Sequence, residues 1–126
     1  MSDLTLIQAR RIVKQAEKTE EETLVERTRV AAEKLVGKHF KFWNGGDGEN
    51  WWLYLMVLAV KSVWKYVATF RAEHIQAAPA FGISVEVNDR PSAHNGELDS
   101  AWQPISETEY VRETGKILRK LGLERR

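Results

Sequence analysis

Gly37 separates two stretches of the chain that have different patterns of apolar residues. Residues 3–36, before it, contain no glycine or proline and consist largely of strong helix formers, which predicts a helical N-terminal segment. Their apolar residues fall into two groups on either side of the polar run 17–23, in which Thr19 and Glu22 have the spacing of a capping box. The segment is therefore either one long helix with a solvated middle or two helices joined near Thr19.

After Gly37 the pattern is typical of strands in an antiparallel sheet, over residues 38–103. Alternating or continuous apolar runs predict strands at 39–43, 51–60, 63–72 and 81–87, with a short edge strand at 100–103. A buried helix over 51–67 is the alternative for the central run, but β-branched residues and the alternation beyond Val63 favour strands. The glycine-rich residues 44–50 are expected to form a turn, and 88–99 a polar loop.

The last helix is delimited at both ends. Ser106 and Glu109 match a capping box, and Gly122 stands where a left-handed residue closes a helix, which predicts a helix over 106–121. The order of these elements predicts an α+β fold in one domain, 1–126. We expect an N-terminal helix or helix pair, a four- to five-stranded antiparallel sheet or partly open small barrel, and a C-terminal helix.

Composition limits the functions open to such a domain. The 19 basic and 18 acidic residues nearly cancel, which argues against a polyanion mimic and gives no general reason for tight nucleic-acid binding. The absence of cysteine excludes disulfides, thiolate zinc sites and thiol nucleophiles. The longest apolar run, 51–60, is too short to cross a bilayer as a helix, and the N-terminus lacks the features of a secretion signal. We therefore expect a cytoplasmic protein without membrane contact.

Nine large aromatic residues lie between Phe40 and Phe70, more ring surface than one small core is expected to need. Single rings such as Trp64 are expected to fill the core, but this aromatic cluster as a whole is expected to reach the surface. Trp43 and Trp52 flank the glycine-rich turn and are the best candidates for exposed or half-exposed rings that anchor a partner. The predicted partner-binding residues are Trp43, Trp52, Phe42, Asp47, Glu49 and Lys41.

A second hypothesis is binding of a single-stranded nucleic acid or a nucleotide, because basic residues are interleaved with the aromatic ones. The predicted contacts are Lys41, Lys65 and Arg71 in the sheet, and Arg10 and Lys14 in a basic stripe on the first helix. The aromatic segment does not match an RNA-binding consensus motif, and ordinary solvation of a sheet and of a helix also explains these charges.

Signatures of catalysis or metal binding are absent from the sequence. His39, His74 and His94 do not have the spacing of metal ligands, and the turn 44–50 matches neither a calcium loop nor a phosphate loop. A pairing of His94 with an acidic residue of the 88–99 loop is a third, enzymatic hypothesis. Catalytic groups need rigid support, and a polar loop is not expected to provide it. We therefore expect that the protein is not an enzyme and that it binds no cofactor or metal.

Three stretches within residues 36–115 resemble small phage-encoded proteins of unknown function. They are Val36-Gly37-Lys38-His39-Phe40-Lys41-Phe42, Trp51-Trp52-Leu53-Tyr54, and Trp102-Gln103-Pro104-Ile105-Ser106-Glu107-Thr108-Glu109-Tyr110. Similar small phage proteins include inhibitors of host defence such as anti-CRISPR proteins. The resemblance implies a non-catalytic inhibitor in the host cytoplasm and no particular functional residues. We therefore predict a module that binds a host protein or protein complex, with the N-terminal helix as a second contact or a homodimer element.

Overall fold

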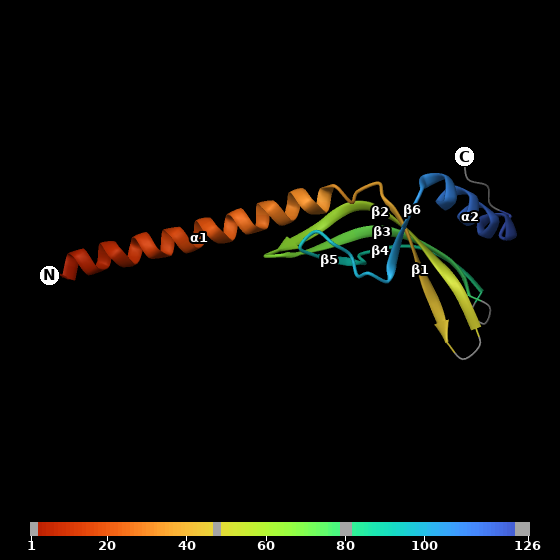
Figure 1. Ribbon diagram of the computed structural model, residues 1–126, viewed down its shortest axis with the longest axis horizontal. Coiled ribbons are helices and arrows are strands. Elements are labelled where there is room, and N and C mark those ends of the chain that lie inside the picture. Colours follow the sequence, from red (N-terminus) through yellow and green to blue (C-terminus); the bar gives the residue numbers. More distant parts are fainter. Residues whose placement is uncertain (1–2, 47–48, 79–81, 123–126) are drawn as a thin grey trace.

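The computed structural model describes residues 3–46, 49–78 and 82–122. Its elements, in chain order, are α1 (Asp3–Glu33), β1 (His39–Gly46), β2 (Glu49–Trp64), β3 (Val67–Ala78), β4 (Gly82–Asn88), β5 (Ser92–His94), β6 (Trp102–Ile105) and α2 (Glu107–Lys120). The strands form one open antiparallel sheet in the order β4-β3-β2-β1-β6, with β5 paired to β3 (Figure 1). The predicted α+β fold is confirmed, and the sheet is not a closed barrel.

The sheet has six strands because β5 forms inside the segment that we expected to be a polar loop. The Ala93 side chain is fully buried in the cluster that contains Leu55 and Phe70, which fixes this short strand beside β3. An Asn95-Gly96 turn with positive φ at both residues follows it and brings Glu97 back to His94. Three residues give too little alternation for a sequence pattern to reveal a strand.

α1 is one continuous helix, so of the two N-terminal alternatives the long helix is observed. Thr19 lies inside it and is not an N-cap, because its hydroxyl donates to the Gln15 carbonyl oxygen at 2.9 Å, and Thr23 does the same to Thr19 at 2.8 Å. Every side chain from residue 6 to residue 24 is exposed, and partly buried side chains begin at Val25. The helix therefore projects from the body for most of its length (Figure 1).

The central apolar run lies in β2, as predicted, but β2 is longer than expected and ends in a tight turn at Lys65 and Tyr66. Lys65 adopts a φ of 52° there. The prediction of one strand over 63–72 is therefore wrong. Trp64 stands at the tip of the β2–β3 hairpin with 66% of its surface exposed, and not in the core. The turn carries no glycine, asparagine or proline, so the usual sequence signal is missing.

Two cores lie on opposite faces of the sheet, since neighbouring residues of a strand point to opposite sides. Leu55, with Phe40 and Phe70, packs against the end of α1 and the β5 region. Tyr54, with Ile75 and Tyr110, packs beneath α2. The aromatic rings are accordingly divided between two faces, and in the described part of the chain they form separate pairs instead of the expected single cluster.

α2 begins as the sequence predicts and covers the second core. The Ser106 hydroxyl accepts a hydrogen bond from the Glu109 backbone N–H at 3.0 Å. Gly122, just beyond the helix, has a φ of 75°. Because α2 lies against β1 and β3, its first turn comes close to the side chains of β1 that point to the same face.

Candidate functional site

Trp43 lies near the end of β1 and faces the side of the sheet that carries α2. Its cross-strand neighbour in β2 is Trp52, and the two rings meet edge to face with centroids 4.7 Å apart. Trp43 keeps 48% of its surface exposed, whereas Trp52 is half-buried against the core beneath α2. The pair thus holds one indole in the protein and presents the other to the outside.

Lys41 fixes the inner ring of this pair. Its Nζ lies 4.4 Å from the centre of the Trp52 ring and 3.2 Å from Oε2 of Glu109 in the first turn of α2. The cation therefore joins β1, β2 and α2 at one point. We call Trp43, Trp52 and Lys41 the Trp43 surface. Glu109 was predicted only as a capping residue, and no local sequence pattern signals its contact with Lys41.

The other predicted partner-binding residues do not extend this surface. Phe42 points to the opposite face, where its ring packs 5.1 Å from that of Trp102. Asp47 lies outside the described residues. Glu49 is placed only as a backbone position of β2, paired with Gly46, and its side chain also lies outside what the structure describes.

The predicted nucleic-acid contacts are dispersed over the molecule. Lys65 is at the β2–β3 hairpin tip, 4.9 Å from the Trp64 ring centre, while Arg10 and Lys14 are exposed on the projecting part of α1. Ile75 of β3 lies level with Lys41 across the sheet. Arg71 stands four residues from Ile75, a distance of about 13 Å along the strand. These five basic residues therefore do not form one continuous track.

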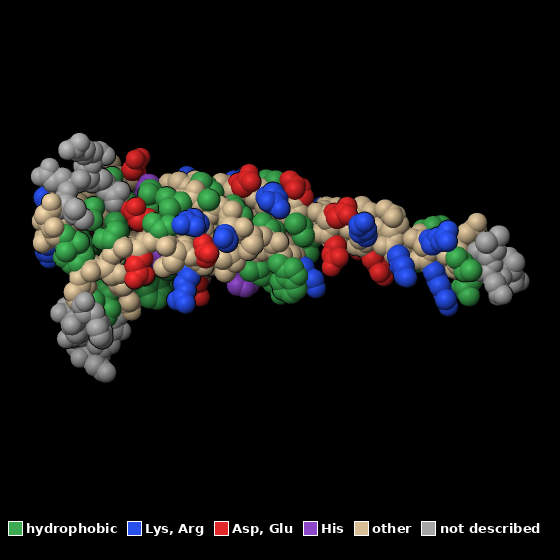
Figure 2. All heavy atoms as spheres, turned by 180° about the vertical axis from the view of Figure 1, so that it is seen from behind, with side chains coloured by type: hydrophobic (Ala, Val, Ile, Leu, Met, Phe, Trp, Pro, Cys, Tyr) green, Lys and Arg blue, Asp and Glu red, His purple; other side chains and the backbone are tan. Residues whose placement is uncertain are grey.

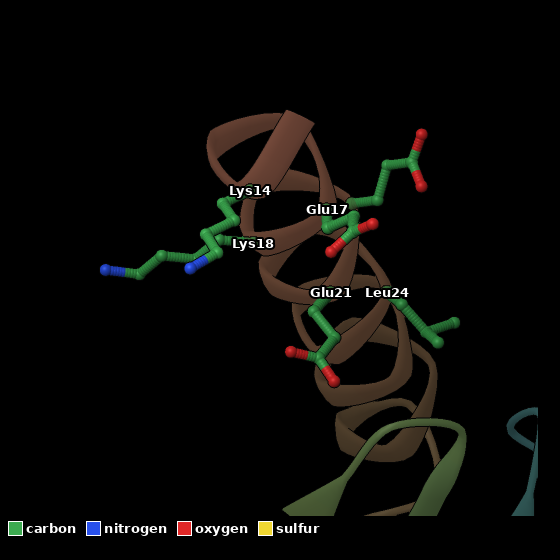
Figure 3. A pocket seen from close by; sticks show the side chains of 6 residues that line it. Lys14, Glu17, Lys18, Glu21 and Leu24 are labelled. Carbon is green, nitrogen blue, oxygen red and sulfur yellow. The ribbon is translucent and has the colours of Figure 1, made fainter. Parts of the chain in front are cut away.

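A hollow that the sequence did not reveal lies between α1 and the tip of the β2–β3 hairpin. It has a volume of about 370 Å³ and is lined by Glu21, Glu22, Val25, Val63, Trp64 and Lys65. Figure 3 shows a second hollow, which is lined only by side chains of α1, including Lys14, Lys18 and Glu21, and is not enclosed by any other element. Neither is a closed pocket for a small ligand.

A pocket of about 480 Å³ opens on the face of the sheet opposite α2. Its lining comes from β2, β3, β4, β5, β6 and the loop before β5: Leu53, His74, Gln76, Glu86, Asn88, Arg90, Pro91, Ser92 and Trp102. His74 is only 9% exposed, and its burial lowers the pKa of its imidazole below the ordinary value of 6.5. His74 Nδ1 and Asn88 Oδ1 are buried without a hydrogen-bond partner.

Two acidic side chains of the 88–99 segment make contacts with residues other than His94. Asp89 forms an ion pair with Lys61 at 3.7 Å, and Asp99 accepts a hydrogen bond from the Ala101 backbone N–H at 2.9 Å. In the described part of the chain, histidines and carboxylates do not gather in a group of three or more that would hold a metal ion. Within the same residues, neither helix combines the length and the apolar character needed to cross a membrane.

Comparison with protein-family models, with curated proteins and with solved structures finds no match for this chain.

Proposed function

We propose that this protein is a non-enzymatic module that binds another protein and anchors it at the Trp43 surface. One observation carries the proposal: Trp43 is about half exposed, yet its ring rests edge-on against the half-buried Trp52. Tryptophan is the side chain most often found at the energetic centre of protein interfaces, because it offers a large apolar area with few rotatable bonds.

The surroundings of the ring favour binding because they fix it in advance. Trp52 restrains Trp43 on one side, and Trp52 is itself held by the Lys41 ammonium and the core beneath α2. A side chain that is already ordered loses little conformational entropy on binding, so more of the contact energy remains as affinity.

The charges at this surface fit a protein better than a phosphate backbone. The Lys41 ammonium contacts the Trp52 ring, and its charge is balanced by Glu109 at 3.2 Å. A nucleic-acid site needs cations that are available to phosphates. The finer hypothesis, an inhibitor of a host defence complex, stays a prediction that identification of the partner would test.

The test compares Trp43→Ala with Trp64→Ala, a matched control that removes an even more exposed indole elsewhere. Each full-length protein is tagged, used to capture partners from cells of the native host with and without nuclease, and analysed by quantitative mass spectrometry. We expect a partner protein that survives nuclease, that falls at least about tenfold with Trp43→Ala, and that Trp64→Ala leaves unchanged.

Equal urea-unfolding midpoints of the two variants would show that the loss comes from the surface and not from unfolding. Full recovery of the partner by Trp43→Ala would overturn the proposal. Recovery of nucleic acid alone, sensitive to nuclease, would support the nucleic-acid hypothesis instead.

A further inference from the structure

One face of α1 carries a stripe of exposed residues, most of them small or apolar. Its members alternate at spacings of three and four residues, the pattern of a helix that packs along another helix: Ala9, Ile12, Ala16, Thr19, Thr23, Glu26 and Val30. Ile12 is 70% exposed, the highest value among the large apolar side chains of the described residues. The hydroxyls of Thr19 and Thr23 bond back to the helix, so these residues can present their methyl groups.

This stripe is not the face by which α1 packs on its own sheet. Thr28 and Ala32, with the half-buried Val25, make that contact, and the Thr28 hydroxyl donates to the Lys65 carbonyl oxygen at 2.7 Å. At 3.6 residues per turn these three positions lie on the side of the helix opposite to Ile12 and Ala16. A second helix can therefore cover the stripe without disturbing the attachment of α1.

A partner would stabilise a helix in this position. The side chains of residues 6–24 are all exposed, and in proteins most of the stability of a helix comes from packing of one face against another element. Burial of an exposed apolar side chain such as Ile12 against a second helix would stabilise the pair. Pairing along the stripe would supply the stabilisation that the body does not give.

The distribution of charge along α1 indicates what the partner is. Basic residues predominate over 10–18, toward the free end, and acidic residues over 20–26, nearer the body (Figure 2): Arg10, Arg11, Lys14 and Lys18 with Glu17, then Glu20, Glu21, Glu22 and Glu26. Arg27 and Arg29 follow at the attached end of the helix. An antiparallel second copy brings the basic part of each helix level with the acidic part of the other. A parallel copy would place like charges level with each other, within roughly a Debye length across the helix pair.

From this self-complementarity we infer that α1 pairs antiparallel with α1 of a second copy of the chain, along the stripe defined above. The two-fold axis lies between residues 17 and 18, so that Ile12 of one copy packs at the level of Thr23 of the other. A symmetric interface of this kind uses the same surface of both copies. The inference is independent of the Trp43 surface, which lies on β1 and β2 and not on α1.

The first experiment measures mass in solution by sedimentation equilibrium for the full chain, Ile12→Glu and Ile7→Glu. Ile7 is the matched control, since it is 47% exposed on the same helix but lies on the side away from the stripe. We expect the full chain and Ile7→Glu to have twice the chain mass of 14.5 kDa, and Ile12→Glu to be a monomer. A monomeric full chain at micromolar concentration, or equal behaviour of the two variants, would overturn the inference.

The second experiment tests orientation and uses the absence of native cysteine. Ala9→Cys and Glu26→Cys are oxidised separately and as a mixture, with tags of different size on the two chains. An antiparallel pair brings position 9 of one copy level with position 26 of the other, so only the mixture gives a cross-linked dimer. Two copies of position 9 would then stand roughly 26 Å apart along the axis. Efficient cross-linking of each variant with itself would show a parallel pair and contradict the proposed arrangement.

Discussion

Gly96 and Ala31 approach each other so closely that a Cβ at Gly96 would stand 2.6 Å from the Cβ of Ala31. The contact joins the turn after β5 to the end of α1, on the face of the first core. Gly96 also has a φ of 80°, which disfavours any other residue.

We therefore expect Gly96→Ala to lower the free energy of unfolding by about 2–4 kcal/mol, from backbone strain and overpacking together. Gly37→Ala is the control, because Gly37 has nearly the same φ, 82°, but nothing within 4 Å of an added Cβ. That change should cost only about 1 kcal/mol. Urea unfolding of both variants measures the difference, and equal losses would show that the contact with Ala31 is unimportant.

Tyr110→Phe should destabilise the core beneath α2. The Tyr110 side chain is fully buried, and its hydroxyl donates to Oε1 of Glu73 at 2.7 Å. Removal of a hydrogen bond to a charged, partly buried group costs about 1.5–3 kcal/mol. Tyr66→Phe, at the exposed hairpin turn, should change the unfolding free energy by less than about 0.5 kcal/mol. Similar unfolding free energies for the two variants would contradict this assignment.

The stability of the protein should decrease below about pH 6.5 because of His74. Burial, aided by nearby Arg90, lowers the pKa of this imidazole in the folded state, although the Ala72 backbone and Glu86 act in the opposite direction. The unfolded chain therefore takes up the proton first as the pH falls through the ordinary value of 6.5, and unfolding becomes more favourable. Denaturant unfolding between neutral pH and about pH 5 measures this decrease.

His74→Gln should reduce that pH dependence, whereas His94→Gln, at an exposed position, should leave it as it is. A wild-type decrease that persists in His74→Gln would place its origin in another group.

The variant Lys41→Met tests whether Lys41 positions the Trp52 ring, separately from its contribution to the stability of the protein. The Lys41–Glu109 ion pair lies at the partly exposed edge of α2, so its loss should cost no more than about 1 kcal/mol of unfolding free energy. Partner binding should nevertheless weaken, by less than with Trp43→Ala, because Trp52 would no longer be held beneath Trp43. Isothermal titration with the identified partner measures both effects, and unchanged affinity would show that Lys41 does not position the rings.

The elements with strong local signals were predictable from the sequence. Ser106 and Glu109 mark the start of α2, and the apolar run 51–60 marks a strand with both faces covered. The turn at Lys65 was not predictable, because its conformation is imposed by the pairing of β2 with β3 and not by a turn-forming residue.

The candidate site was predictable only in part, for a related reason. The position of Trp43 beside the glycine-rich turn identified an exposed ring. The contact between Lys41 and Glu109 joins residues far apart in the chain, and it depends on the position in which α2 packs on the sheet. Whether α1 is one helix or two could not be decided from the sequence, because a capping box at Thr19 would start a new helix. In the structure the helix continues through Thr19.

The direction in which α1 leaves the sheet has a consequence for valency. The helix departs from one end of the molecule, and β1, which carries Trp43, runs toward the other (Figure 1). In the inferred pair the two bodies would sit at the ends of a rod, each with its indole turned outward. Such a pair would bind a target with repeated sites more tightly than a target with a single site, through avidity. The length of the rod would determine which spacing between sites the pair can span.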